Sequence, residues 1–265
     1  MRDYVAMYLC IENDFCLEES IVALKSQGLK DAYIFHPKRY WSSGELAQEK
    51  AMTELASIAV KTSSMLVPMD EPKETVEPIQ IEGWMRNYAL RFLRDRGWSD
   101  ILIIDGDELW MPGTLEEVDN LLKPSPAKIN LHLIAVAGMP GYPITSKGGE
   151  ALVYVPTGVN ISWGRSCGTG VVPSRTCNRS GLHFSMVRKT MEQLLKKCRL
   201  SAHYKQPGYD FEWWIKDVLP NIKPGATDVH CYRAPTNIWP LVREWTAEEW
   251  ALIPETLKPY LGACK

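Results

Sequence analysis

Three carboxylates follow a run of branched apolar residues in the stretch ILIIDGDE. Asp105 and Asp107 are separated by Gly106, and Glu108 comes directly after them. The ILII segment has the length and composition of a buried strand, so the carboxylates are expected where that strand ends. Glycine allows the chain to turn there, which would direct both aspartates into one crevice. Because crowded carboxylates repel each other, the motif predicts a bound Mg²⁺ or Mn²⁺ with coordination positions left for phosphate.

The same residues allow two other interpretations. In an EF-hand loop that starts at Asp105, the twelfth position carries glutamate, and Glu116 falls there. The sixth position of such a loop requires glycine, however, and the sequence has Trp110. The second alternative is an acidic strand-to-helix connection that binds no ligand. The abrupt change from a buried strand to three carboxylates favours the metal site.

The first half of the chain alternates between strand and helix patterns. Apolar runs of strand length occupy residues 4–11, 32–35, 65–68 and 101–104. Helical spacing occurs from Leu17 to a stop at Gly28, over 45–58 and over 84–96. A T-x-x-E capping box at Thr114 and Glu117 predicts a further helix from about Leu115. This alternation predicts an α/β fold with a mostly parallel central sheet flanked by helices.

The second half has a different pattern. Strands are expected at 128–136, 151–155 and 160–163, and helices at 187–200 and 208–219. Prolines and aromatic residues in the last 35 residues predict an irregular tail packed on the body. We therefore expect a single domain whose first half is residues 1–125. Residues 126–265 would form a second, mixed α+β half.

The composition is that of an ordinary soluble globular chain, with 265 residues, 45% of them hydrophobic and 23% charged. No apolar run approaches the ~20 residues that a membrane helix needs, and acidic residues near the N-terminus argue against a signal peptide. The seven cysteines are odd in number and contain no CxxC pair, which favours a reduced, cytoplasmic protein. A zinc site would need Cys167, Cys177, His183 and Cys198, whose spacing is not a common zinc pattern.

The charge is unevenly distributed along the sequence. Residues 160–205 contain nine basic residues and one acid, Glu192, although the whole chain has a net charge of -2. Such a segment is typical of contact with a polyanion or a phosphorylated ligand. The alternative is a solvated helix face with charged loops.

Three stretches together resemble family 2 glycosyltransferases with the GT-A fold. IIDGDELWMPGTLEEV is similar to that family's D-x-D-E…P-G-x-L segment, and CIENDFCLEESIVALKSQG to its first strand and helix. WMRNYALRFLRDRGWSDILIIDGDE resembles its R-N-x-A-L run. The pieces occur in family order over residues 4–118. The resemblance implies a nucleoside-diphosphate sugar such as a UDP-sugar as donor and Mn²⁺ or Mg²⁺ as cofactor.

The resemblance also implies roles for particular residues. Asp105 would lie nearest the ribose and the metal, and Asp107 would be the firmer metal ligand. A third metal ligand is expected from His183, with His230 as its rival. The remaining donor-binding positions would be Cys10, Ile11, Glu12, Asn13, Arg86, Asn87, Gly106, Arg188 and Lys189.

The sequence departs from the family pattern in two places. The loop after the second strand reads HPKRYW instead of an acidic D-x-S-T pattern, so His36 or a backbone group would have to read the base. No clear motif marks the catalytic base, for which Asp210 is the first candidate and Glu212 and Glu108 are the next. The neighbouring Trp213 and Trp214 could stack on a sugar, but a place in the core is favoured.

These observations predict a metal-dependent, inverting hexosyltransferase that moves a sugar to a hydroxyl of a saccharide or glycoconjugate. The basic segment leaves a hydroxylated base in DNA open as an alternative acceptor, so nucleic acid is a possible partner. An alternative of another class is a nucleotide- or polyanion-binding module without turnover. The sequence indicates no protein partner.

Overall fold

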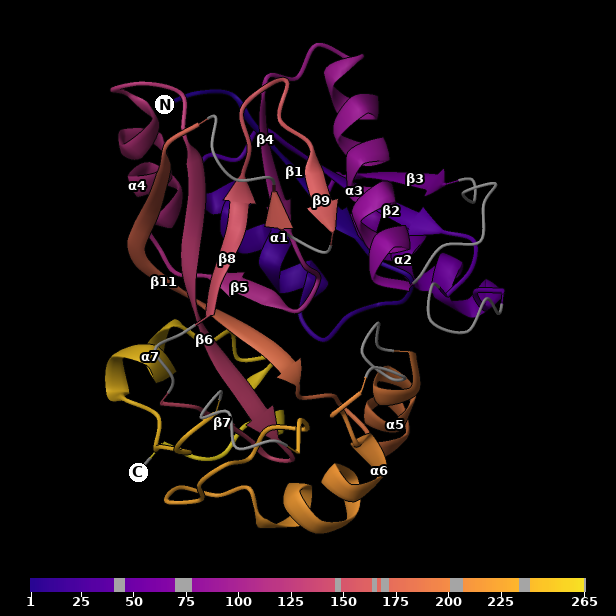
Figure 1. The fold of residues 1–265 in the computed structure, drawn as a ribbon, viewed down its shortest axis with the longest axis vertical. Coiled ribbons are helices and arrows are strands. Elements are labelled where there is room, and N and C mark those ends of the chain that lie inside the picture. Colours follow the sequence, from indigo (N-terminus) through magenta and orange to yellow (C-terminus); the bar gives the residue numbers. More distant parts are fainter. Residues whose placement is uncertain are drawn as a thin grey trace. The chain divides into compact units, whose positions relative to one another are not determined.

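Figure 1 shows the course of the chain in a computed structural model, which describes residues 1–40, 46–69, 78–145, 149–163, 166–167, 172–200, 207–233 and 239–264. The chain forms two compact units. The first contains Met1–His132 and Glu150–Gly181, and the second contains Leu133–Gly149 and Leu182–Lys265. Strands β6 (Lys128–Gly138) and β11 (Ser174–Met186) contribute residues to both units. The predicted division at residue 125 separates a donor-binding half from an acceptor-side half. That division concerns substrate binding and stays a prediction.

Four parallel strands form one side of the main sheet. They are β1 (Tyr4–Leu9), β2 (Asp31–Pro37), β3 (Met65–Met69) and β4 (Asp100–Ile104), in the order β3-β2-β1-β4. Each neighbouring pair is parallel. Helices α1 (Leu17–Ser26), α2 (Glu49–Lys61) and α3 (Pro78–Arg94) connect them. The predicted α/β class and the four predicted strands are confirmed.

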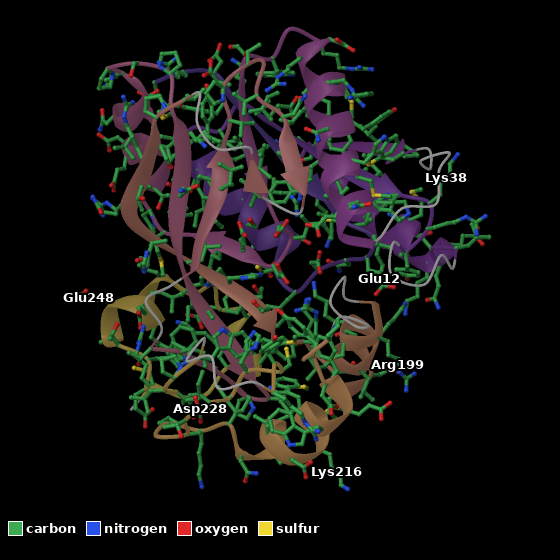
Figure 2. The ribbon with its side chains drawn as sticks, viewed as in Figure 1. Glu12, Lys38, Arg199, Lys216, Asp228 and Glu248 are labelled. Carbon is green, nitrogen blue, oxygen red and sulfur yellow. The ribbon has the colours of Figure 1, made fainter. Side chains whose placement is uncertain are left out.

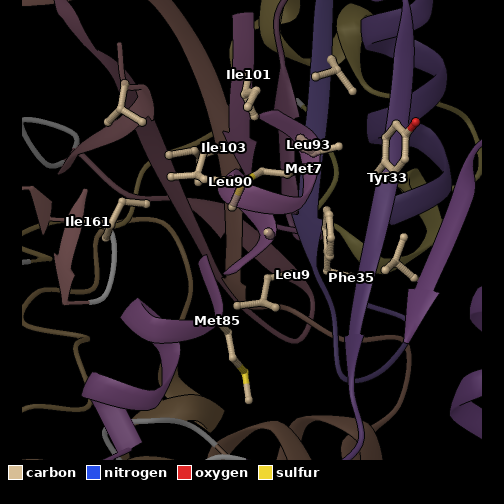
Figure 3. Packing of buried hydrophobic residues seen from close by; sticks show 14 of the residues in the cluster. Met7, Leu9, Tyr33, Phe35, Met85, Leu90, Leu93, Ile101, Ile103 and Ile161 are labelled. Atoms are coloured by element: carbon tan, nitrogen blue, oxygen red, sulfur yellow. The ribbon is translucent and has the colours of Figure 1, made fainter. Parts of the chain in front are cut away.

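The core of this unit explains why β1 contains no charged residue. Every residue of β1 is buried, as expected for a parallel strand covered on both faces. One face packs against α3, in the cluster of Figure 3 that includes Met7, Leu9, Met85, Ile101 and Ile103. Helix α1 buries its apolar stripe and contacts β5 (Glu108–Trp110).

The sheet continues beyond β4 with strands of different origin. The order is β4-β8-β6-β11-β5, where β8 is Gly149–Tyr154 and pairs antiparallel with β4. A short strand, β7 (Gly141–Pro143), is antiparallel to β6, and β9 (Ile161–Trp163) pairs with β10 (Ser166–Cys167) in a separate ribbon. The sheet is therefore mixed. The long strand β11 is a feature that the sequence pattern did not predict at its full length.

The predicted capping box at the start of α4 (Thr114–Leu122) is wrong. The N-cap is Gly113, whose φ of 82° lies in the left-handed region that glycine adopts without strain. Thr114 is already helical and makes no capping hydrogen bond. The carboxylate of Glu117 instead accepts hydrogen bonds from the backbone N–H groups of Asn178 and Arg179, at 2.6 and 3.1 Å. Glu117 thus fastens α4 to β11.

The second unit contains short helices and an irregular tail. Helix α5 covers Met191–Leu200, and α6 (Phe211–Trp213) continues into a π-helical turn at Trp214–Val218. Trp214 is fully buried, which confirms its predicted place in the core. The tail contains α7 (Ala247–Leu252) and buries Trp245. Among the residues that the structure describes, no helix has both the length and the apolarity needed to cross a membrane.

Candidate functional site

The acidic motif lies at the topological switch point of the parallel strands. The chain passes from β1 outward to β2 and β3, whereas β4 adds on the other side of β1. Because β1 and β4 are parallel neighbours, the loops that follow them both begin at the carboxyl edge of the sheet, where open α/β sheets bind ligands. Asp105 to Asp107 follow β4, and residues 10–16 follow β1. The fold thus gives the predicted donor residues a position suited to binding.

The loop after β1 approaches the turn of the acidic motif closely. A β-carbon at Gly106 would lie 2.8 Å from Cβ of Asp14 and 3.0 Å from Sγ of Cys10. The backbone N–H of Cys16 donates to the carbonyl of Gly106 at 3.4 Å. Glycine is needed at this position because any side chain would push the two loops apart. Asp14 is a neighbour of the motif that the sequence reasoning missed.

A buried arginine holds Asp105 from the side of α3. Nη2 of Arg86 donates to Oδ1 of Asp105 at 2.8 Å and to Oε1 of Glu82 at 2.7 Å, and Nε of Arg86 also donates to Glu82. Burial alone would lower the pKa of Arg86, but the two carboxylates outweigh it and raise that pKa above its usual value. The guanidinium therefore stays charged. The role of Glu82 was missed, although its position four residues before Arg86 was a readable helical pairing signal.

The two aspartates of the motif differ in exposure. The Asp105 side chain is 26% exposed, whereas Asp107 is 3% exposed. Glu108 is fully buried, and its backbone N–H donates to the carbonyl of Asp105 at 3.1 Å, which closes the turn. The buried Glu108 is placed to support the turn, and the choice of catalytic base stays a prediction.

The predicted base-reading residue, His36, lies at the end of β2 beside the loop after β1. Its Nδ1 is 3.1 Å from the carbonyl oxygen of Cys10. Because a carbonyl only accepts, Nδ1 carries the proton and Nε2 is left as an acceptor in the neutral ring. Burial lowers the pKa of His36 below its usual value. The ring is therefore neutral at pH 7.

The other residues of the β1 loop have different environments. Cys10 and Ile11 are buried, whereas Asn13 is exposed. Glu12, labelled in Figure 2, is partly buried and accepts a hydrogen bond from the hydroxyl of Tyr40. The loop that packs against the acidic turn therefore contains both buried apolar residues and polar residues that are at least partly exposed.

Asn87, the neighbour of Arg86, has a structural contact. Its Nδ2 donates to the carbonyl of Ile161 at 2.6 Å, and its Oδ1 accepts from the Ile161 N–H at 2.9 Å. Both ends of the amide thus hold the start of β9 against α3. The predicted contact of Asn87 with the nucleotide stays a prediction.

The predicted third metal ligand belongs to the second unit. His183 forms a hydrogen bond with the hydroxyl of Ser185, at 3.0 Å from Nδ1. Its rival His230 accepts from the Tyr232 N–H at 3.0 Å, and its ring packs edge-on against Trp239. Within the described ranges, no three His, Cys, Asp or Glu side chains gather closely enough to hold a metal ion.

The side chains at the turn are of the chemical type that a hard divalent cation prefers. Its ligands would be the carboxylate oxygens of Asp105 and Asp107. Mg²⁺ is commonly bound through one or two carboxylates together with substrate phosphates and waters, without a complete protein cage. The third ligand, whether His183 or His230, stays a prediction.

The remaining predicted residues of the second unit are engaged with their own surroundings. Oδ1 of Asp210 accepts from the Trp213 N–H at 2.9 Å, and its Oδ2 lies 3.3 Å from Nε of Arg233. Arg188 is buried and donates to the carbonyls of Phe184 and Val187. Lys189 is exposed, with Nζ 6.0 Å from the centre of the Tyr260 ring. Asp210 and Arg188 thus have structural contacts, and the roles predicted for them stay predictions.

Part of the basic segment also has internal partners. Arg175 donates to the carbonyls of Leu121 and Ser125 and so binds the C-terminal end of α4. Arg179 is exposed and lies 3.8 Å from the carboxylate of Glu117. Arg165 and Lys205 fall outside the described residues. Nucleic-acid binding by this segment stays a prediction.

Comparison with known proteins gives structural likenesses only. No protein-family model matches the sequence, and no curated protein matches it either. The fold is similar to S. aureus TarS, with 13% identity, a TM-score of 0.35, and coverage of 52% of this chain but 22% of TarS.

Two further likenesses extend over most of the compared proteins. One is Rv0371C of Mycobacterium tuberculosis H37Rv, solved in complex with manganese, with 10% identity, a TM-score of 0.41 and coverage of 75% of this chain and 98% of Rv0371C. The other is the inositol-1-phosphate CTP transferase of T. maritima, with 12% identity, a TM-score of 0.36 and coverage of 73% and 95%. Scores and identities this low leave the function to be argued from the residues of this chain.

Proposed function

We propose that the protein is a glycosyltransferase that moves a sugar from a nucleoside-diphosphate sugar to a hydroxyl group. The observation that carries this proposal is the convergence of three features at the switch point of the sheet. They are the D-G-D turn after β4, the loop packed against it after β1, and the buried Arg86 that holds Asp105. The order of these pieces along the chain also matches the GT-A pattern noted above.

Each part of the site has a distinct proposed task. Asp105 and Asp107 would hold a divalent cation, Mn²⁺ or Mg²⁺, which supplies Lewis-acid stabilisation to the leaving diphosphate when it is bound. Arg86 keeps the carboxylate of Asp105 oriented through the 2.8 Å hydrogen bond. The loop after β1 and the neutral His36 would contact the base and ribose.

Transfer with inversion needs a base on the acceptor side. The acceptor hydroxyl attacks the sugar carbon from the face opposite the diphosphate, and a carboxylate accepts the hydroxyl proton. Asp210 is the proposed base because its side chain is 33% exposed, whereas Glu108 is fully buried. A saccharide or glycoconjugate is the proposed acceptor, since two arginines of the basic segment already bind carbonyl groups of this chain.

The test is release of nucleoside diphosphate by the purified protein from a panel of sugar nucleotides with Mn²⁺. We expect release with at least one donor and its loss in excess chelator. Asp107→Asn should lower kcat/KM by about 100-fold or more, equivalent to about 2.7 kcal/mol of transition-state stabilisation. Glu116→Gln, an exposed carboxylate on α4, is the matched control. Turnover that persists in chelator, or no release from any donor, would contradict the proposal.

A further inference from the structure

Arg86 is shared between two carboxylates that have different relations to the candidate site. Asp105 is a proposed cation ligand, whereas Glu82 lies on α3, one helical turn before Arg86. Oε1 of Glu82 accepts from both Nε and Nη2 of the guanidinium, at 3.2 and 2.7 Å. Among the nitrogens of Arg86, Nη2 is the one that donates to Asp105, at 2.8 Å. Glu82 therefore occupies the edge of the guanidinium formed by Nε and Nη2 and holds it in an orientation that gives Asp105 a single hydrogen bond.

The guanidinium is enclosed, so these contacts determine its orientation. Arg86 is 3% exposed, and its Nη1 has no hydrogen-bond partner in the described part of the chain. Without Glu82, the buried guanidinium would be free to turn and donate two parallel hydrogen bonds to the remaining carboxylate, because such paired bonds are especially strong. Asp105 would then be neutralised by a full ion pair.

The charges of the trio lead to the same conclusion. One guanidinium and two carboxylates leave a net negative charge beside the turn. Without the Glu82 carboxylate, the guanidinium and Asp105 together have no net charge. A divalent cation is attracted by uncompensated carboxylate charge, and it competes with Arg86 for the oxygens of Asp105.

We infer that Glu82 is a positioning residue that holds Arg86 and thereby preserves the capacity of Asp105 to bind a divalent cation. This inference rests on the proposed function, because it takes Asp105 as a cation ligand. Glu82 touches neither donor nor acceptor in this account. It acts only through Arg86.

The experiment is a calorimetric Mn²⁺ titration of the full chain in the wild type and in Glu82→Gln. Glutamine keeps the size of the side chain and an acceptor oxygen but removes its charge. We expect Mn²⁺ binding to weaken by roughly tenfold, at the lower end of the usual effect of residues that orient metal ligands. Glu54→Gln is the matched control, since Glu54 forms an exposed i,i+4 pair with Lys50 on α2. It should bind Mn²⁺ like the wild type.

A double-mutant cycle separates positioning from a simple loss of nearby negative charge. In an Arg86→Met background, Glu82→Gln should change Mn²⁺ affinity by less than about twofold, because the guanidinium that it positions is gone. A full-sized effect in that background would overturn the inference. If Arg86→Met does not fold, Arg86→Lys takes its place, because lysine keeps the charge but lacks the planar group that Glu82 orients. Glu82→Gln should then change Mn²⁺ affinity by less than about twofold, and a full-sized effect overturns the inference.

The titrations also distinguish this inference from the proposed function. If the wild type binds Mn²⁺ no better than Asp107→Asn, the proposed metal site fails, and the inference about Glu82 fails with it. If Asp107→Asn loses Mn²⁺ binding but Glu82→Gln keeps it, the metal site stands and only the role of Glu82 is overturned.

Discussion

At the scale of single residues, burial gives chemically similar side chains different capacities. Asp105 and Asp107 are one residue apart, yet the first is partly exposed and paired with Arg86, and the second is almost completely buried. The sequence predicted both carboxylates at a strand end. It could not predict their burial, because that depends on the loop after β1, whose Asp14 and Cys10 lie against Gly106.

His36 leads to a prediction about pH. Its pKa is lowered by burial, so the unfolded chain binds a proton at a higher pH than the folded chain does. The contribution of His36 to stability is therefore present above its unfolded pKa, about 6.5, and decreases as the pH falls below that value. We expect wild-type unfolding free energy to fall more steeply between pH 7 and 5 than that of His36→Gln. Parallel pH dependences in urea denaturation would contradict this.

At the scale of elements, the burial pattern of each strand determined whether the sequence predicted it. Strands β1, β2 and β4 are buried on both faces and appear as continuous apolar runs, and the edge strand β3 is apolar although partly exposed, so all four were predicted. Strand β11 has the burial pattern of a half-exposed strand and contains Arg175, Asn178 and Gly181, which obscure the alternation. The three-residue β5 is too short to give a periodic signal. The capping box failed because Gly113 already caps α4.

Glu117 gives a test of how α4 is attached to the sheet. Its carboxylate accepts two backbone hydrogen bonds from β11, and its side chain is 24% exposed. Glu117→Ala should lower the free energy of unfolding by about 1 kcal/mol, because both N–H groups lose their charged acceptor. The adjacent, exposed Glu116 provides the control, and Glu116→Ala should have little effect. Equal changes in unfolding free energy for Glu117→Ala and Glu116→Ala would show that the Glu117 hydrogen bonds contribute nothing to stability.

At the scale of the whole molecule, the proposed donor residues are concentrated in the first unit. Asp105, Asp107, Arg86, His36 and the loop after β1 all belong to it. The second unit contains His183, Asp210, Arg188 and Lys189. The roles predicted for them are metal binding, proton acceptance and donor binding. In that unit, exposed cations such as Arg199 and Lys216 are labelled in Figure 2. The proposed donor residues follow parallel strands that the sequence pattern predicted, whereas the basic segment is divided between both units, and the roles of both sets stay predictions.

The central claim is that one site after β1 and β4 binds a nucleoside diphosphate together with a divalent cation. Its most direct test is the calorimetric affinity for UDP, GDP, CDP and ADP with and without Mn²⁺. For at least one nucleotide we expect Mn²⁺ to raise the affinity by about fivefold or more, as is typical of coupled ligands, and we expect Asp107→Asn to abolish this coupling. The account would be contradicted if none of the four nucleotides bound, or if Mn²⁺ changed the affinity for none of them. It would also be contradicted if the coupling survived in Asp107→Asn.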